Sequence, residues 1–294
     1  MLFRSAYQML GHQLLVPIPD IDRTQYMIIL GGNPLVSNGS LMTAPDIRNR
    51  LKAIQSRDGK FVVIDPRRTE TAKLANEHCF IQPGTDVYFL IGIIQEIIKN
   101  GWIKQGHLDS VTKNLDEFLT SIPDIELETI SSITGISSTN IQRIAKEFSQ
   151  AESAVCYGRM GACTQKFGGT VHWLINMVNI ITGNFDAPGG AMFTSPAFDT
   201  LANSQTKGHY NKGQSRVRNL PGFAGEYPAV TMADEMLVKG EGQIRAMVTS
   251  AGNPILSVPG GEKLDRAFSG LEFMVSIDFY INETTRHADI ILPP

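Results

Sequence analysis

The first hundred residues alternate between short apolar runs and amphipathic stretches. Apolar runs bounded by turn residues are typical of strands buried on both faces of a parallel sheet, and apolar residues three or four apart are typical of helices. The pattern predicts strands at residues 26–30, 61–64 and 79–82, with helices at residues 45–56 and 69–76 between them. This βαβαβ order indicates an α/β protein with a doubly wound, mostly parallel sheet.

Helical patterns predominate after this point. Pro83-Gly84-Thr85-Asp86 opens a long amphipathic helix, and residues 101–150 continue with helical spacing. Residues 154–157 return to a strand, which residues 170–181 follow as a strongly apolar helix. Residues 194–228 are rich in Ser, Asn, Gly and Pro and have few apolar runs, which predicts an irregular linker between domains.

The opening pattern then returns. Residues 244–249 and 273–277 are predicted strands on either side of a helix at residues 262–268, and residues 290–292 are a further strand. Polar residues repeat in the same order. The first copy has Gly32-Asn33-Pro34, Asp65, Glu70 and Pro83, and the second has Gly252-Asn253-Pro254, Asp278, Glu283 and Pro293. This internal repeat predicts two related domains.

Composition is that of an ordinary globular protein, with 42% hydrophobic and 19% charged residues. The net charge of −3 provides no basic field, so nucleic acid is not an expected partner. No apolar run is long enough to predict membrane insertion. Cys79, Cys156 and Cys163 form no CxxC pair, which disfavours zinc and iron–sulfur frames and predicts reduced, buried thiols in a cytoplasmic protein.

The repeated turns carry the candidate chemistry. A Gly-Asn-Pro turn at the carboxyl end of a strand places backbone N–H groups and an amide where open α/β sheets bind ligands. Asp65 and Asp278 end neighbouring strands, where a carboxylate can accept from guanine N–H groups or ribose hydroxyls. The helix that begins at Asp86 has free N–H groups for phosphate. Arg67 and Arg68 can balance the charge of a pyrophosphate.

Each of these features also has a purely structural interpretation. A Gly-Asn-Pro turn can close a loop without binding anything, but two copies, each with an aspartate at the next strand end, favour binding at Asn33 and Asn253. Asp86 can act only as a residue of the first helical turn. Arg67 and Arg68 can form a solvated surface, and His172 is typical of a buried core histidine.

Taken together, the motifs resemble the molybdopterin oxidoreductases of the dimethyl sulfoxide reductase and formate dehydrogenase superfamily. The resemblance covers residues 20–294. Its ordered motifs are Gly31-Gly32-Asn33-Pro34, Asp65-Pro66-Arg67-Arg68-Thr69-Glu70-Thr71, Pro83-Gly84-Thr85-Asp86, Arg159-Met160-Gly161 with Gln165, residues 182–190, Gly252-Asn253-Pro254, and Asp278 with Asn282-Glu283-Thr284 and residues 287–293.

In that family, two pterin guanine dinucleotides hold one molybdenum or tungsten atom, and related α/β domains hold their guanine ends. The resemblance implies one such domain at residues 20–193, a linker at residues 194–228, and half of an incomplete second domain at residues 229–294. Residues 1–19 would be a remnant of an upstream segment. The implied cofactor-binding residues are Gly32, Asn33, Pro34, Asp65, Arg67, Pro83, Gly84, Thr85, Asp86, Arg159, Met160, Gly161, Gln165, Gly252, Asn253, Asp278 and Glu283.

The sequence departs from the family in what it lacks. No side chain stands out as a metal ligand, so neither a metal ligand nor a catalytic residue is predicted. A four-iron cluster is expected only in a missing N-terminal domain, and a closing barrel domain is expected after residue 294. Gln165 also stands one residue further from Met160 than the family pattern. The expected partners are the missing domains of the same parent chain and an electron-transfer subunit.

Three functions compete at this point. The first is a bis(molybdopterin guanine dinucleotide) oxidoreductase, in which the full-length parent moves an oxygen atom or a hydride equivalent at the metal. The second is a non-catalytic scaffold of an electron-transfer complex, which the missing metal ligand permits. The polar residues kept in both turns favour the first. A nicotinamide dehydrogenase is disfavoured because no GxGxxG follows the first strand.

Overall fold

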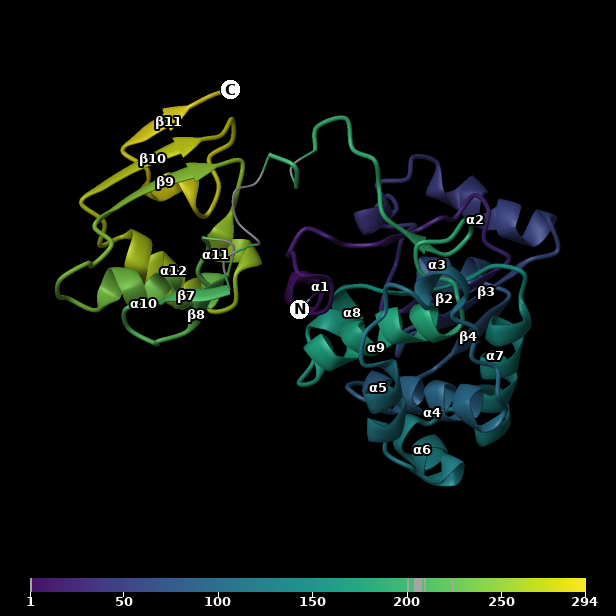
Figure 1. Ribbon diagram of the computed structural model, residues 1–294. Helices are drawn as coiled ribbons and strands as arrows, with labels where there is room; N and C mark the ends of the chain where they lie inside the picture. Colours follow the sequence, from purple (N-terminus) through teal and green to yellow (C-terminus); the bar gives the residue numbers. More distant parts are fainter. Residues whose placement is uncertain (1, 200, 204–207, 209, 224) are drawn as a thin grey trace. The chain divides into compact units, whose positions relative to one another are not determined.

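The computed structural model describes residues 2–199, 201–203, 208, 210–223 and 225–294 (Figure 1). The chain divides into two compact units, unit 1 at residues 1–207 and unit 2 at residues 208–294. Each unit contains a parallel sheet with helices, which confirms the predicted α/β class.

A four-stranded parallel sheet forms the centre of unit 1, in the order β4-β3-β2-β5. The strands are β2 (Tyr26–Leu30), β3 (Lys60–Ile64), β4 (Glu77–Cys79) and β5 (Ala154–Gly158). Every residue of β2 and β5 is buried, which explains their uninterrupted apolar sequences. The chain leaves β2 towards β3 on one side and returns to β5 on the other. The ends of β2 and β5 therefore form a switch point, where open sheets bind ligands.

Helices cover both faces of this sheet (Figure 1). On one face lie α2 (Ile47–Ser56) and α3 (Glu70–Leu74). The other face is covered by α4 (Asp86–Lys99), α7 (Ser138–Gln150) and α9 (Gly168–Ile181), and α4 packs against both of the others. Unit 1 also contains α5 (Leu115–Ser121), α6 (Leu127–Thr134), η1 (Ser40–Met42) and η2 (Gly106–Leu108).

The amino-terminal residues are integrated into unit 1. Helix α1 (Leu2–Leu10) packs against α9, and β1 (Ile18–Pro19) pairs antiparallel with β6 (Ala191–Met192). A short helix, α8 (Met160–Cys163), connects β5 to α9. The described residues of the segment 1–19, which was expected to be a remnant, thus pack and pair within this unit.

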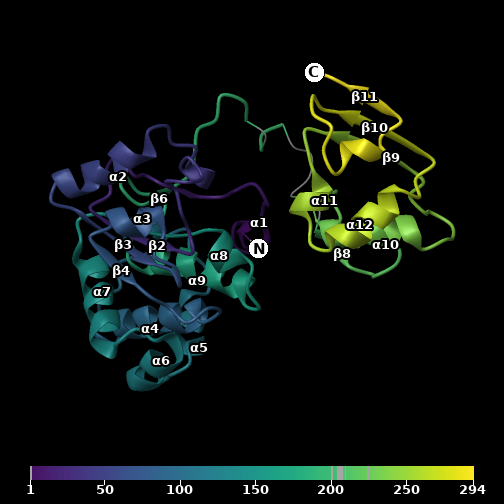
Figure 2. The ribbon, with the colours of Figure 1, turned by 180° about the vertical axis from the view of Figure 1, so that it is seen from behind.

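Unit 2 contains a three-stranded parallel sheet in the order β11-β10-β9 (Figure 2). Its strands are β9 (Ala246–Ser250), β10 (Phe273–Ile277) and β11 (Ile290–Leu292). Its helices are η3 (Ala229–Thr231), α10 (Met232–Leu237), α11 (Pro254–Ser257), α12 (Gly261–Phe268) and η4 (Thr285–His287). Met236, Leu264, Phe268 and Met274 form the centre of a small core between α10, α12 and the sheet.

The opposite face of the unit 2 sheet is open. Val248 is 67% exposed, Phe273 46%, Ile290 45% and Leu292 49%. Parallel sheets are normally covered on both faces. Unit 2 therefore has an apolar sheet face that its own described residues leave uncovered.

Two predicted elements differ from the structure. The strand expected at residues 79–82 lies at Glu77–Cys79, because Glu77 and His78 pair with β3 despite their polarity. Residues 194–228 are not wholly irregular, since β7 (Tyr210–Gln214) and β8 (Pro221–Phe223) form an antiparallel hairpin. Its polar, glycine-containing strands lack the alternation that would have predicted it. In the described part of the chain, no helix is long and apolar enough to cross a bilayer.

Candidate functional site

The two copies of the sequence repeat adopt the same turn after their first strands. In unit 1, the Gly31 N–H donates to the Ile64 carbonyl of the neighbouring strand at 3.1 Å. In unit 2, the Ala251 N–H donates to the Ile277 carbonyl at 3.0 Å. Both Gly-Asn-Pro turns therefore leave the carboxyl edge of a parallel sheet, as the sequence predicted.

Asn33 joins the first turn to helix α3. Its Oδ1 accepts from Thr71 Oγ1 at 2.8 Å and from the Thr71 N–H at 3.2 Å, while its Nδ2 donates to Glu70 Oε2 at 2.8 Å. Thr71 is fully buried. The asparagine amide, which the sequence suggested could face a ligand, thus forms hydrogen bonds with neighbouring residues of the protein.

The second turn repeats this arrangement. Asn253 Oδ1 accepts from Thr284 Oγ1 at 2.7 Å, and its Nδ2 donates to Glu283 Oε2 at 2.7 Å. The hydrogen bond from Asn253 Nδ2 lowers the pKa of Glu283, as the matching bond from Asn33 Nδ2 lowers the pKa of Glu70. Within the described residues, the N–H groups of Gly32, Asn33, Gly252 and Asn253 have no hydrogen-bond partner. Each turn therefore offers backbone donors in place of its amide side chain.

A cavity of about 420 Å³ opens at the carboxyl edge of the unit 1 sheet. Four chain segments converge on it, because the carboxyl ends of parallel strands meet at one edge. Its lining consists of Gly31 after β2, Asp65 and Pro66 after β3, Pro83, Gly84 and Asp86 at the start of α4, and Gly161, Thr164, Gln165 and Lys166 after β5. The structure thus brings together six of the predicted site residues in one cavity.

The loops after β2 and β5 cross in direct contact at Gly31 and Gly161. The Gly161 N–H donates to the Gly31 carbonyl at 2.9 Å. A Cβ on Gly31 would lie 2.5 Å from the Ala162 nitrogen, and one on Gly161 would lie 2.8 Å from the Gly31 Cα. Gly31 also has a positive φ of 53°. Any side chain at either position would separate the loops that form this side of the cavity.

Asp86 places a carboxylate in the first turn of α4 with only 4% of the residue exposed. Its Oδ2 accepts from Gln165 Nε2 at 2.6 Å, and the same nitrogen donates to the Gly161 carbonyl at 2.7 Å. Burial raises the pKa of Asp86 and the nearby Asp65 carboxylate adds to this, although the bond from Gln165 opposes both. Gln165 Oε1 is buried without a hydrogen-bond partner. This wall of the cavity is therefore rich in acceptors and short of donors.

The equivalent aspartates differ in their surroundings. Asp65 Oδ1 accepts from the Arg67 N–H at 2.8 Å, and its Oδ2 has no hydrogen-bond partner among the described residues. The Asp278 carboxylate accepts from the N–H groups of Phe279 at 2.7 Å and Tyr280 at 3.2 Å, and from Asn282 Nδ2 at 3.3 Å. Asp65 therefore keeps more acceptor capacity for a ligand than Asp278 does.

The other predicted residues of unit 1 are not part of the lining of this cavity. Arg67 is exposed at the rim, and Met160 is 62% exposed. Arg159 Nε donates to Ser40 Oγ at 2.6 Å, which ties it to the loop after β2. Thr85 Oγ1 donates to the Gln82 carbonyl at 2.6 Å and so closes the turn before α4.

Thr164 and Lys166 were not singled out from the sequence, although both line the cavity. Neither residue belongs to the internal repeat, and of the three consecutive residues 164–166 only Gln165 was predicted to bind the cofactor. The exposed ammonium of Lys166 adds a positive charge to a wall that also contains two carboxylates.

His172 is a core histidine in α9, 2% exposed, as its structural interpretation predicted. Its Nε2 lies 2.9 Å from Cys163 Sγ. Burial lowers the pKa of His172 to about 4, so the ring is neutral near pH 7. Cys79 and Cys156 are buried as expected, whereas Cys163 is partly exposed, which corrects the prediction for that thiol.

A doubly wound parallel sheet with duplicated strand-end turns defines a class of α/β protein in which ligands bind at the carboxyl ends of the strands. Comparison with known proteins identifies the family. The model of the molybdopterin oxidoreductase family matches residues 5–294, and the chain belongs to this family. The sequence prediction of the dimethyl sulfoxide reductase and formate dehydrogenase superfamily is thereby confirmed.

Individual relatives support the same assignment. The chain is 27% identical to the assimilatory nitrate reductase catalytic subunit of Bacillus subtilis and 25% identical to formate dehydrogenase H of Escherichia coli, over 94% of its own length in both cases. It spans 40% of the length of each. Acetylene hydratase from Pelobacter acetylenicus has the same fold, with a TM-score of 0.76 and 17% identity over 98% of this chain and 44% of that one.

Proposed function

We propose that this chain is the cofactor-binding portion of an oxidoreductase that carries bis(molybdopterin guanine dinucleotide) with molybdenum or tungsten. The observation that carries the proposal is the duplicated framework. Each copy sets unpaired backbone N–H groups beside an aspartate at the next strand end. Two copies of one such arrangement in one chain favour two similar ligands, as two dinucleotides would be.

The residues of unit 1 fit a guanine nucleotide. Guanine presents N–H donors along one edge, and the free Oδ2 of Asp65 and the buried carboxylate of Asp86 are acceptors on the same cavity. The unpaired N–H group of Gly32 and the side chains of Arg67 and Lys166 can donate hydrogen bonds to phosphate oxygens. The crossing glycines allow backbone to approach the ligand closely.

When bound, the metal–pterin group supplies the oxygen-atom or hydride-equivalent transfer. The residues of this chain bind and orient it. Asp65 and Asp86 fix the base through hydrogen bonds, and Arg67 compensates the charge of the phosphates. We assign no general base and no metal ligand to this chain.

Unit 2 is proposed to be the incomplete counterpart of unit 1. Its open sheet face carries apolar side chains that a folded domain would cover. The remaining domains of the parent chain are the proposed cover, and an electron-transfer subunit is the proposed redox partner in the cytoplasm. A non-catalytic scaffold would need the same cover, so this feature alone does not separate the two functions.

Cofactor content separates them. The full-length parent is purified after growth with molybdate or tungstate, the metal is measured, and GMP released by acid hydrolysis is counted per metal atom. A catalytic member should release about two GMP per metal atom, because each dinucleotide carries one guanine. A protein purified without metal and GMP would be a scaffold and would overturn the proposal.

The isolated chain should have no turnover with an oxyanion, a sulfoxide or formate. The reason is that we assign no metal ligand to these residues and that they span only 40% of the length of the two relatives named above. Measured molybdenum-dependent activity of this chain alone would refute that assignment of parts.

A further inference from the structure

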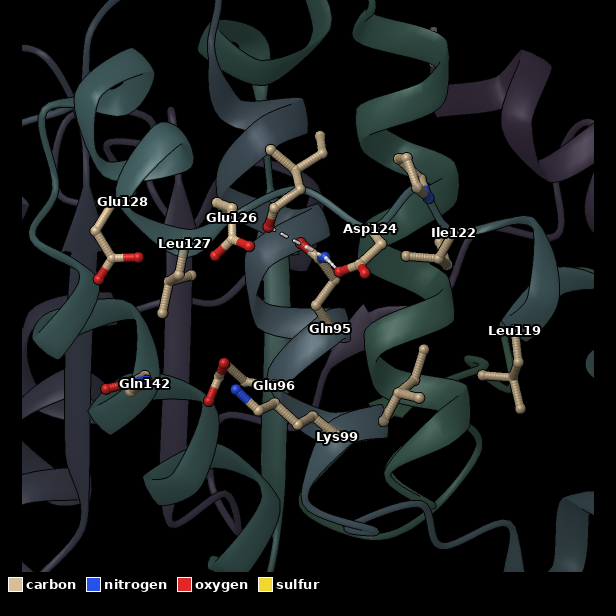
Figure 3. A pocket seen from close by; sticks show the side chains of 13 residues that line it. Gln95, Glu96, Lys99, Leu119, Ile122, Asp124, Glu126, Leu127, Glu128 and Gln142 are labelled. Carbon is tan, nitrogen blue, oxygen red and sulfur yellow. Dashed lines mark hydrogen bonds between the residues drawn. The ribbon is translucent and has the colours of Figure 1, made fainter.

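A second cavity, of about 640 Å³, lies in unit 1 away from the candidate site (Figure 3). It is bounded by the carboxyl-terminal half of α4, the connection from α5 to α6, the start of α6 and Gln142 of α7. Helix α4 runs from Asp86 at the first site to Glu96 at the second cavity, which is about 15 Å along the helix axis. The two cavities are separate.

The second cavity is acidic at its rim and apolar between the charges. Its carboxylates are Glu96, Asp124, Glu126 and Glu128, and Lys99 is the one cation among the lining residues. Its apolar lining is formed by Ile98, Leu119, Ile122, Pro123, Ile125 and Leu127. This surface complements a positively charged group on an aliphatic stem.

Glu96 is a buried carboxylate that the protein leaves incompletely satisfied. The residue is 7% exposed, and Figure 3 shows its carboxylate between Gln142 and Lys99. Its Oε2 accepts only a long hydrogen bond, from Asn100 Nδ2 at 3.4 Å. Its Oε1 has no hydrogen-bond partner within the residues that the structure describes. Solvent in the cavity reaches this oxygen, and a charged donor that replaces the solvent would form a charge-assisted hydrogen bond with it.

The neighbouring Gln95 repeats the shortage of donors. Its Nε2 is shared between Asp124 Oδ1 and the Ile125 carbonyl, both at 3.3 Å. Its Oε1 is buried without any partner. Because Gln95 Oε1 is enclosed by protein atoms, the Glu96 carboxylate is the acceptor of this pair that a ligand in the cavity can reach.

We propose that this cavity binds an organic cation with an aliphatic stem, either a polyamine or a lysine or arginine side chain of a polypeptide. The ammonium or guanidinium head lies against Glu96, and the stem packs on Ile125 and Leu127. A single metal ion does not fit, because no three His, Cys, Asp or Glu side chains converge as ligands in the described parts of the chain. The proposal does not depend on the proposed function, since it concerns a separate cavity.

Calorimetric titration of the 294-residue chain tests the proposal with two probes. Spermidine represents the polyamine source, and the peptide acetyl-Leu-Arg-Leu-Arg-Leu-amide represents the polypeptide source. Saturable binding of either probe, reduced by salt, is the expected result, and the probe that binds identifies the source. Hexane-1,6-diol, which has the stem without the charge, should not bind. Absence of saturable binding by both cationic probes would overturn the proposal.

Variants connect binding to this cavity. Glu96→Gln should weaken binding roughly tenfold, because one charge-assisted hydrogen bond is lost. Lys99→Gln removes the cation of the lining and should strengthen binding severalfold. Glu117→Gln, an exposed position on α5 outside the cavity, makes the same charge change as Glu96→Gln and should leave binding within about twofold.

Because Glu96→Gln and Lys99→Gln are both measured, the test still gives an answer if one of the two variants misfolds. Lys99 is exposed, so Lys99→Gln should fold even if Glu96→Gln does not. Glu96→Gln should also melt no lower than the wild type, because it replaces an incompletely satisfied buried charge. Equal binding by the Glu96, Lys99 and Glu117 variants would place the cation elsewhere and refute the proposed site.

Discussion

Units 1 and 2 share a strand-end framework and differ in what surrounds it. In each unit the asparagine side chain of the turn, Asn33 or Asn253, forms hydrogen bonds with a glutamate and a threonine, at nearly the same distances in both units. Yet Ile28 of β2 is 1% exposed, whereas Val248, which stands five residues before Asn253 as Ile28 stands before Asn33, is 67% exposed. The framework therefore depends on local sequence, and the covering of the sheet depends on segments far away in the chain.

The polar edges of the two sheets differ in the same way. In unit 1 the amino-terminal edge carries a network in which Glu147 contacts Tyr26 Oη at 2.8 Å, Lys60 Nζ at 2.8 Å and Arg143 at 3.1 Å. Glu77 joins it through Arg143 and Lys60. In unit 2 the described residues of the corresponding edge form one exposed ion pair, between Arg245 and Glu272. Ion pairs and hydrogen bonds thus connect the strands and α7 at this edge of unit 1, and no comparable network is present among the described residues of unit 2.

The largest expected effect concerns the covered and open sheet faces. Ile28→Ala should lower the free energy of unfolding by about 2 to 5 kcal/mol, because it leaves a cavity in a packed core. Val248→Ala should change it by about 0.5 kcal/mol or less, because the side chain is exposed. Urea unfolding of the 294-residue chain measures both. A large loss for the Val248 variant would show that the open face is covered in solution.

A smaller effect is expected at the amino-terminal edges. Glu147→Gln should lower stability by about 1.5 to 3 kcal/mol near pH 7, because it weakens charge-assisted hydrogen bonds in a partly buried network. Glu272→Gln is the matched control, and its exposed pair should contribute little. Thermal unfolding of the two variants makes the comparison.

The same network predicts a pH dependence. Burial raises the pKa of Glu147, but hydrogen bonds from Lys60, Tyr26 and Arg143 outweigh it and hold the pKa below the ordinary 4.5. Because the folded-state pKa is depressed, the stabilisation is present above pH 4.5 and is lost as the pH falls through the folded value. Wild-type stability should therefore fall on acidification, and Glu147→Gln should reduce that fall. An unchanged acid limb in the variant would contradict the role of this network.

The sequence predicted the framework because its signals are local. Apolar runs of five residues, turn residues at their ends and the repeated order of Asn, Asp and Glu specified strands, turns and strand-end polar residues without reference to distant contacts. The prediction failed where pairing overrides composition. Glu77 and His78 enter β4 because β3 offers a hydrogen-bonding edge, and residues 210–214 pair with 221–223 although their sequence lacks apolar alternation.

Candidate site residues were predictable as a set, whereas their individual contacts were not. The sequence placed Asp65, Asp86 and Gln165 among ligand contacts, and the structure brings them to one cavity. It gave no means to foresee that Asn33 would bond Glu70 and Thr71, since this bond joins residues 37 and 38 positions apart. The acidic cavity beside α4 was not predicted, because its lining comes from four helices and the connection from α5 to α6, which share no sequence motif.

The equivalent aspartates should separate cofactor binding from local structure. In the full-length parent, Asp65→Asn should lower dinucleotide retention about tenfold or more, because the free Oδ2 is lost as a charged acceptor. Asp278→Asn should mainly lower the melting temperature, because its carboxylate already accepts three bonds from its own loop. GMP content and melting temperature are measured on both. Full cofactor occupancy with lowered stability in the Asp65 variant would assign that residue a structural role.

The smallest expected effect concerns the exposed residues that follow Asp65 and Asp278, which form the rims of these two strand ends. Counted from the aspartate that ends each second strand, Arg67 and Arg68 of unit 1 correspond to Tyr280 and Ile281 of unit 2. Tyr280 is 67% and Ile281 80% exposed, so one rim is cationic and the other aromatic and apolar. Charge on an exposed rim acts through screened attraction, whereas an aromatic ring acts through stacking on a planar base.

Arg67→Gln should therefore weaken GDP binding by the chain about threefold at low salt, and the difference should vanish near 0.5 M salt as screening removes the contribution of the arginine. Tyr280→Leu should also weaken binding about threefold, but equally at both salt concentrations, because stacking involves no net charge on the ring. Isothermal titration with GDP at low and high salt measures all four combinations. Equal salt dependence of the two variants would mean that the rims, like the frameworks behind them, act alike.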